Sequence, residues 1–346
     1  MKRNMLAKKL MAGLLTGAMV LSMGGMTAFA ETKDVTFQKE ITKEANVYTP
    51  AVGTIDFTVV PATGGTNYAG MVVYDGIAEG VSFVSGASFA VSDGLADTSL
   101  TANVTLRIDT TKFYDDEGNL KPGIYRYTVK ETDPNYDGLA ADMKDYTLDV
   151  YVSSTTEAGD TFEAFLLDLD DPSKKLEKIT NVYTTNTLEV EKQVEGNQGN
   201  KNKEFNFTIT IKGTEGETYY VTKGTDMLPA MVCGEDGVAT LTVALKDDES
   251  VVITGLSEED TFTVVETEAN DDGYITTYTL NGEASTEGDL KNGVVEGLSD
   301  QTVVVTNTKN VTTPTGIAMT FAPYVAMVVF AGVFAVMFLR KKREDF

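Results

Sequence analysis

Two sets of three polar residues recur in one order along the chain, each made of a lysine, a glutamate and an asparagine. They are Lys39, Glu131 and Asn181, followed by Lys192, Glu266 and Asn307. A neutral lysine amine is a nucleophile, and a carboxyl group beside it transfers protons as a general acid and base. Such an amine can attack the side-chain carbonyl carbon of asparagine and form an amide bond, with ammonia as the leaving group. Each set therefore has the groups needed to crosslink the chain to itself, with Glu131 and Glu266 as catalytic residues.

The six residues continue the apolar faces of predicted strands, because side chains on one face of a strand recur at every second position. Lys39 falls in phase with Phe37 and Ile41. Glu131 falls in phase with Val129, and the second set repeats this phasing. Burial disfavours the charged forms of both amines and carboxyl groups, so the predicted positions favour the reaction.

A buried ion pair between lysine and glutamate, with a hydrogen-bonded asparagine, is the other interpretation and needs no reaction. An unpaired charge in an apolar core is costly, so in either case the lysine and the glutamate of a set must lie together. Two sets in the same order, each ending in a threonine followed by its asparagine, favour the reaction.

The elements that must position these residues are short strands. Residues with alternating polarity are separated by turn signals such as 116–119, 270–273 and 281–282, a pattern typical of antiparallel β-sandwiches. Residues 55–60 and 127–132 are repeated as 205–210 and 262–267. This repeat predicts two domains, 31–184 and 185–309, each with its lysine in the first strand and its asparagine in the last.

Both ends of the chain read as processing signals. A basic start, an apolar run and an Ala-Phe-Ala site predict a signal peptide over residues 1–30. Residues 317–339 carry no charge and would span about 34 Å as a helix, and a basic tail, 340–346, follows. We expect a transmembrane segment there, with its basic end in the cytoplasm.

A short motif stands directly before this segment: Thr312, Thr313, Pro314, Thr315 and Gly316. A plain membrane anchor with a Pro/Gly turn at its edge is one interpretation. The order of motif, apolar span and basic tail resembles a sortase sorting signal, which forms the last region of the chain, 310–346. The resemblance implies cleavage between Thr315 and Gly316.

The composition excludes several classes of function. Acidic residues number 52 against 28 basic ones, giving a net charge of −24, so we expect no nucleic-acid partner. The chain has no histidine, which rules out Ser-His-Asp and Cys-His catalysis. We therefore expect no enzyme beyond a single-turnover self-crosslinking, no metal and no cofactor. A single cysteine, Cys233, allows no disulfide within one chain.

With these motifs in place, the chain resembles a Gram-positive major backbone pilin of the streptococcal isopeptide type. The segments that carry the resemblance include 188–197 and 268–274. The resemblance implies an all-β fold of two tandem Ig-like or CnaB-like antiparallel sandwiches, with Lys39–Asn181 and Lys192–Asn307 bonds. It also implies export, transient membrane anchoring and covalent polymerisation by a sortase. The implied partners are identical subunits, minor and tip pilins and peptidoglycan, in a pilus or cell wall at the cell surface.

Polymerisation needs an exposed lysine to receive the next subunit. Lys174 stands seven residues before Asn181, after a turn at residues 170–173, and aligns with the linking lysine of the family that the chain resembles. Its neighbour Lys175 is the alternative. A wall-anchored adhesin whose crosslinked sandwiches form a stalk is the other functional hypothesis. It is less favoured because the two domains use the whole chain between its signals.

Overall fold

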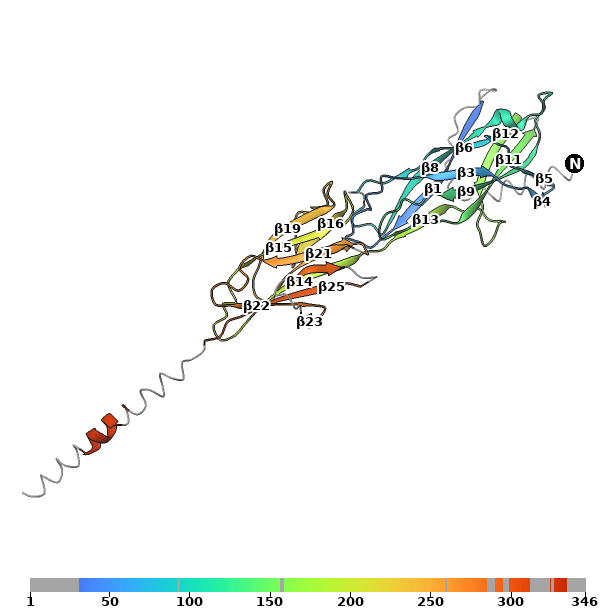
Figure 1. Cartoon of the computed structure of the whole chain (residues 1–346). Coiled ribbons are helices and arrows are strands. Elements are labelled where there is room, and N and C mark those ends of the chain that lie inside the picture. The colour runs from blue at the N-terminus through green and yellow to red at the C-terminus, as the bar shows by residue number, and fades with distance from the viewer. Residues whose placement is uncertain are drawn as a thin grey trace, which may run out of the picture.

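The computed structural model describes residues 31–91, 94–155, 159–258, 260–284, 290–294, 299–311, 324 and 327–334. The predicted signal peptide (1–30), the sorting motif (312–316), the basic tail (340–346) and most of the apolar segment 317–339 lie outside these residues. Within the described part of the chain, no helix has the length and apolar character needed to cross a bilayer. Two β-sandwiches follow one another along a common long axis (Figure 1).

Domain 1 is a sandwich of two main sheets. The first has the order β10-β13-β1-β8-β6 and the second the order β12-β11-β9-β5-β4, with β3 also paired to β9. A small third sheet joins β2 to β7. The elements are β1 (Thr32–Thr42), β2 (Thr54–Ile55), β3 (Phe57–Pro61), β4 (Gly65–Tyr68), β5 (Met71–Asp75), β6 (Val81–Ser85), β7 (Ala87–Ser88), β8 (Ser99–Asp109), the 3-10 helix η1 (Thr110–Phe113), β9 (Gly123–Glu131), β10 (Leu139–Ala140), β11 (Asp145–Thr155), β12 (Gly159–Leu166) and β13 (Lys178–Tyr183).

Domain 2 is a second sandwich with a larger and a smaller sheet. The larger has the order β17-β16-β20-β14-β25-β22-β23, with β18 also paired to β16, and the smaller the order β19-β15-β21-β24. The elements are β14 (Asn186–Glu195), β15 (Phe205–Lys212), β16 (Thr218–Lys223), β17 (Asp226–Met227), β18 (Met231–Val232), β19 (Val238–Leu245), β20 (Glu249–Leu256), β21 (Thr261–Glu266), β22 (Ile275–Leu280), β23 (Glu283–Ala284), β24 (Leu290–Val294) and β25 (Gln301–Thr308). The prediction of an all-β sandwich fold is confirmed.

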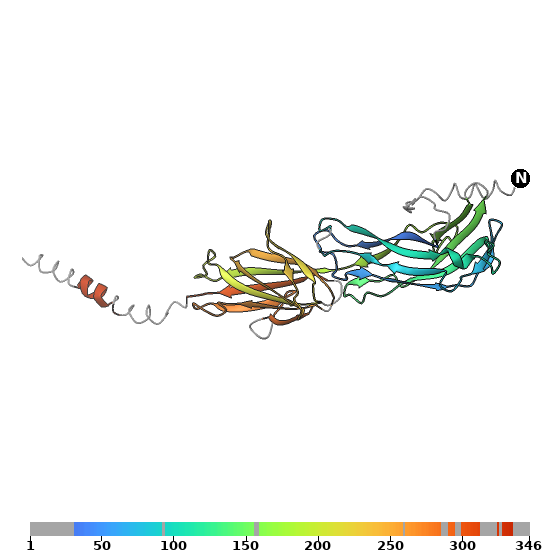
Figure 2. The same cartoon turned by 90° about the horizontal axis from the view of Figure 1, so that it is seen from above.

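The first and last strands of each domain are parallel neighbours. β1 pairs with β13, and β14 pairs with β25, whereas most other pairings are antiparallel. Parallel strands need a long crossover connection, and here the rest of each domain supplies it. Because β1 and β13 run in the same direction, the chain enters domain 1 at one end and leaves it at the other. This direction produces the extended tandem arrangement seen in both views (Figures 1 and 2).

Each sandwich has its own hydrophobic core between its sheets. The core of domain 1 draws on buried residues from Val35 to Tyr183, and that of domain 2 on buried residues from Leu188 to Val305. In domain 1, Phe37 of β1 meets Phe57 of β3 edge to face, with ring centroids 5.1 Å apart. The alternating burial of β14 and β25 follows from side chains that point to opposite faces of a strand.

Candidate crosslinking sites

In domain 1, the three predicted residues come from three strands and two sheets. Lys39 lies in β1 and Asn181 in β13, which pair so that Lys39 stands opposite Ile179 and Ile41 opposite Asn181. Glu131 is the last residue of β9 in the facing sheet, opposite Phe57 of β3. The alternation of β1 and β13 turns Lys39 and Asn181 inward, so that all three side chains meet inside the core.

The contacts of domain 1 join the three side chains into one buried cluster. Lys39 Nζ lies 2.8 Å from Glu131 Oε2, and both side chains are fully buried. Lys39 Nζ also donates a hydrogen bond of 2.6 Å to Asn181 Oδ1. Asn181 Nδ2 donates a hydrogen bond to Glu131 Oε1. The amine, the carboxyl group and the amide of asparagine are therefore in mutual contact.

One member of this site comes from outside the predicted set. The backbone N–H of Asp142 donates a hydrogen bond of 2.8 Å to Asn181 Oδ1. The sequence contains no signal for this donor, because every residue except proline carries a backbone N–H. Asp142 is held in turn by Tyr146, whose hydroxyl donates to Asp142 Oδ2 at 2.6 Å.

In domain 2, the corresponding strands repeat the arrangement. Lys192 of β14 stands opposite Val305 of β25, and Val194 stands opposite Asn307, which is the register of β1 and β13. Glu266 is the last residue of β21 in the facing sheet. It lies opposite Phe207 of β15, as Glu131 lies opposite Phe57 of β3.

The contacts of domain 2 are similar, but they differ at the asparagine oxygen. Lys192 Nζ lies 3.0 Å from Glu266 Oε2, and both side chains are fully buried. Asn307 Nδ2 donates to Glu266 Oε1 at 2.6 Å. Lys192 Nζ donates to the carbonyl oxygen of Val305 at 3.2 Å. Within the described part of domain 2, Asn307 Oδ1 is buried without a hydrogen-bond partner.

Burial changes the acidity of both lysines. Desolvation lowers the pKa of Lys39, and the hydrogen bond and charge of Glu131 oppose this effect without cancelling it. Desolvation likewise lowers the pKa of Lys192 against the opposing charge of Glu266. A lowered lysine pKa increases the fraction of neutral amine, which is the form able to attack a carbonyl carbon.

The two candidate linking lysines lie in the connection from β12 to β13. Lys174 is exposed over 72% of its side chain and pairs with Asp171 at 3.1 Å. Lys175 is partly buried, with its Nζ atom 4.4 Å from the ring centroid of Phe165, and desolvation lowers its pKa. Lys174 is therefore the more accessible of the two amines.

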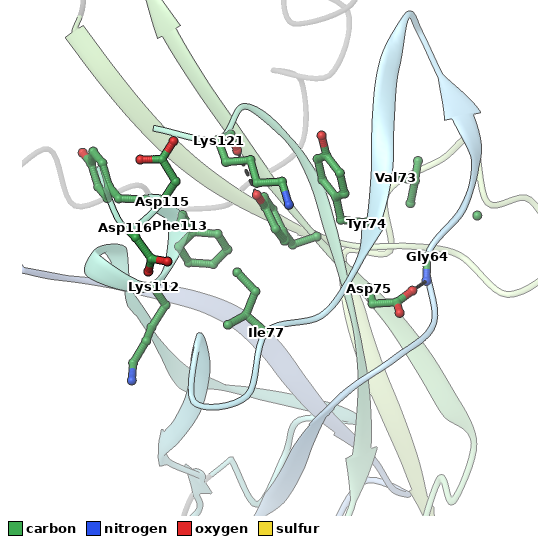
Figure 3. Close-up of a pocket in the computed structure, with 13 residues that line it drawn as sticks. Gly64, Val73, Tyr74, Asp75, Ile77, Lys112, Phe113, Asp115, Asp116 and Lys121 are labelled. Carbon is green, nitrogen blue, oxygen red and sulfur yellow. Dashed lines mark hydrogen bonds between the residues drawn. The ribbon is translucent and has the colours of Figure 1, made fainter. Parts of the chain in front are cut away.

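A separate groove of about 800 Å³ lies at the end of domain 1 that carries β4 and β5 (Figure 3). Within it, Lys121 Nζ lies 4.5 Å from the ring centroid of Tyr74. The backbone N–H of Gly64 donates to the carboxylate of Asp75 at 2.7 Å. None of the residues that line the groove belongs to either set, so the groove takes no part in the crosslinking sites.

Comparison with known proteins identifies relatives for both domains. A family model described as a domain of unknown function (DUF7601) matches residues 186–309. A pilin from Streptococcus pyogenes serotype M1 is 33% identical over 238 residues, which cover 64% of this chain and 68% of the relative. The pilus tip adhesin Cpa from Streptococcus pyogenes is 34% identical over 133 residues, which cover 38% of this chain and 18% of the adhesin.

Solved structures share the fold over most of the chain. The major pilin T3.2 from Streptococcus pyogenes matches with a TM-score of 0.53 and 25% identity, covering 81% of this chain and all of the other. A second major pilin from the same species matches with a TM-score of 0.56 and 21% identity, covering 80% of this chain and 99% of the other. The identity to the curated pilin, over about two thirds of each protein, shows that the chain belongs to the pilin family, as a structural pilus subunit of a Gram-positive bacterium.

Proposed function

We propose that this pilin forms a covalent pilus shaft in which each domain is closed by its own amide bond. Lys39 reacts with Asn181 in domain 1, and Lys192 reacts with Asn307 in domain 2. The observation that supports this proposal is the same buried contact of lysine, glutamate and asparagine in two domains.

The reaction in each domain exchanges one amide for another. The neutral lysine amine attacks the side-chain carbonyl carbon of asparagine, and a carbon–nitrogen bond forms. The glutamate carboxylate accepts a proton from the amine and returns it to the asparagine nitrogen, which leaves as ammonia. Because the glutamate ends as it began, it acts as a general base and then as a general acid. Both Glu131 Oε2 and Glu266 Oε2 lie within 3.0 Å of their lysine nitrogens, which suits this transfer.

Intact mass spectrometry tests the two bonds. Purified protein spanning residues 31–311 should have a mass that is lower than its sequence mass by two ammonia molecules. Substituting Glu131→Ala or Glu266→Ala should restore one ammonia each, because proton transfer fails while the lysine and the asparagine remain. A wild-type protein with the full sequence mass would refute both bonds and leave two buried ion pairs.

The same proposal covers assembly of the shaft. A sortase cleaves between Thr315 and Gly316, and the resulting acyl-enzyme is resolved by Lys174 of another subunit. The exposure of Lys174 supports this choice, since an enzyme must bring its acyl group to the amine. The proposed partners are the sortase, identical subunits, a tip subunit similar to Cpa and the peptidoglycan at the base.

Substitution of the linking lysine tests assembly. Cells that carry an intact sortase and the Lys174→Ala variant should lose the ladder of covalent polymers seen in wall extracts. Lys112→Ala serves as the control, because Lys112 is partly exposed, over 37% of its side chain, but lies far along the sequence in η1. If the ladder persists in a variant that lacks both Lys174 and Lys175, the connection between β12 and β13 does not hold the linking amine.

A further inference from the structure

The two crosslinking sites differ in what faces the asparagine oxygen. In domain 1, Asn181 Oδ1 accepts hydrogen bonds from Lys39 Nζ and from the backbone N–H of Asp142, at 2.6 and 2.8 Å. In domain 2, Asn307 Oδ1 is buried and has no hydrogen-bond partner among the residues that the structure describes. A backbone N–H can only donate, so its contact in domain 1 identifies the atom that faces it as the carbonyl oxygen.

The topology explains why, among the described residues, this donor is found in domain 1 and not in domain 2. In domain 1, the two-residue strand β10 pairs with β13, with Ala140 opposite Val182, and the chain then crosses to the facing sheet as β11. This crossing carries Asp142 past Asn181. In domain 2, the six-residue strand β22 remains in the same sheet and pairs with β25, with Thr276 opposite Asn307. The backbone N–H of Thr276, the residue opposite Asn307, instead donates to Asn270 Oδ1 at 3.0 Å.

The oxygen of asparagine is the atom on which negative charge develops during the proposed reaction. When the lysine nitrogen bonds to the carbonyl carbon, the carbon–oxygen double bond opens and its electron pair moves to Oδ1. A donor that already points at this position stabilises the transition state, and the loss of one such donor costs about 100-fold to 1000-fold in rate. When ammonia leaves, the pair returns and the double bond re-forms.

We infer that the backbone N–H of Asp142 acts as an oxyanion donor for the Lys39–Asn181 reaction and that domain 2 lacks an equivalent donor. The inference rests on the proposed crosslinks and adds a catalytic group to one of them. Tyr146 acts as a positioning residue, because its hydroxyl holds the Asp142 carboxylate and thereby the segment that carries the N–H. Domain 1 therefore closes faster than domain 2 once both are folded.

The experiment follows each bond separately in the protein spanning residues 31–311. Unlinked chain is recovered in denaturant, its full sequence mass is confirmed, and it is refolded by dilution. Samples are quenched over time and digested, and the peptides that join Lys39 to Asn181 and Lys192 to Asn307 are quantified. The pH is kept low enough that bond formation is slower than folding, because protonated lysine does not react.

The variant that removes the donor is Asp142→Pro, since proline has no backbone N–H. It should slow the domain 1 bond about 100-fold and leave the domain 2 bond as an unchanged internal standard. Met143→Pro is the matched control: it places proline at an exposed neighbour and keeps the N–H of Asp142. Asp142→Ala keeps the N–H but frees the Tyr146 hydroxyl, so it should fall between wild type and Asp142→Pro.

Several results would overturn the inference. Equal rates for wild type and Asp142→Pro would show that the N–H has no catalytic role, and so would an equal loss in Met143→Pro. An Asp142→Ala variant as slow as Asp142→Pro would assign the effect to the carboxylate instead. If circular dichroism shows that Asp142→Pro does not fold, the two bonds are compared in the wild-type protein. A domain 2 bond that forms as fast as the domain 1 bond would then refute the catalytic role of the Asp142 N–H. Absence of both bonds in wild type would instead refute the proposed function itself.

Discussion

The proposed lysine chemistry in the two sites depends on the removal of the Nζ atoms from water. Lys39 and Lys192 are both fully buried. The Nζ atom of Lys192 lies 4.5 Å from the ring centroid of Phe205 and 3.0 Å from Glu266 Oε2. Desolvation is the largest cause of the lowered pKa at each lysine. A residue that would be a solvated cation on a surface becomes a usable amine in this setting.

The lowered pKa values predict how bond formation depends on pH. The protonated amine has no lone pair, so the rate should rise about tenfold per pH unit while lysine is mostly charged. It should level off above the lowered pKa, at a pH below the usual lysine value of 10.5. Refolding at a series of pH values, followed by mass spectrometry, measures this profile for each bond. A rate that does not change with pH would show that deprotonation of lysine does not limit the reaction.

At the scale of elements, the junction between the domains is short and contains buried polar groups. β13 ends at Tyr183 and β14 begins at Asn186, so few residues separate the sandwiches. The hydroxyl of Ser257 donates to the carbonyl oxygen of Asp137 in domain 1, at 3.2 Å, and to Glu217 in domain 2, at 2.8 Å. Ser257 therefore links the two domains through a hydrogen bond.

Two buried carboxyl groups lie beside this contact. Asp260 accepts hydrogen bonds from the backbone N–H of Ser257 and from the Tyr219 hydroxyl, at 2.9 and 3.3 Å. Burial, together with the neighbouring Glu217, raises the pKa of Asp260 from 3.8 to about 8. Burial also raises the pKa of Glu217. When both carboxyl groups are ionised their negative charges repel each other, so protonation of one removes the repulsion.

The raised pKa of Asp260 predicts the pH dependence of stability. Between about pH 4 and pH 8 the folded state holds a proton that the unfolded state releases, so stability falls as pH rises through this window. Asp260→Asn removes the titrating group and should therefore raise the melting temperature more at pH 8 than at pH 4. Thermal unfolding followed by circular dichroism measures this difference. The control, Glu235→Gln, alters the same charge at an exposed site, and an equal response of the two variants would contradict the prediction.

At the scale of the whole molecule, the parallel end strands determine how the protein carries load. Tension enters each domain along its first strand and leaves along its last. Because Lys39 and Asn181 lie in adjacent parallel strands, a bond between them connects the two directly, and Lys192 and Asn307 do the same in domain 2. The residues between each pair are then excluded from the path of the force.

Mechanical extension tests this arrangement. When the wild-type protein is pulled between residues 31 and 311, neither domain should lengthen by unfolding. Glu266→Ala leaves domain 2 unlinked, so the 115 positions that separate Lys192 from Asn307 should add about 380 Å of contour length. Glu131→Ala should add about 470 Å in domain 1, where 142 positions separate the two residues. Single-molecule force spectroscopy measures these lengths, and a wild-type domain that extends as far as its variant would disprove the load path.

The sequence by itself determined the fold class and the inward direction of the six candidate side chains. Strand alternation is local, with a period of two residues, so Lys39 could be assigned to a buried face from its neighbours Phe37 and Ile41 alone. The duplication of the set is also visible in the sequence, because lysine, glutamate and asparagine recur in the same order within similar segments. The roles of Lys174 and of the sorting motif remain predictions, because they were inferred from a family resemblance and not from contacts between residues.

Only the tertiary structure decided which groups surround the atoms that are proposed to react. The parallel register of β1 with β13 depends on a crossover of more than a hundred residues, and no local pattern encodes it. The Asp142 donor depends on β10 ending after two residues and the chain then crossing between sheets. At the junction, the Ser257 hydroxyl contacts Glu217 and also Asp137 of the other domain, and both residues are distant from it in sequence. Contacts of this kind depend on how the two sheets pack against each other. The type of one residue does not determine which residue will face it across the core.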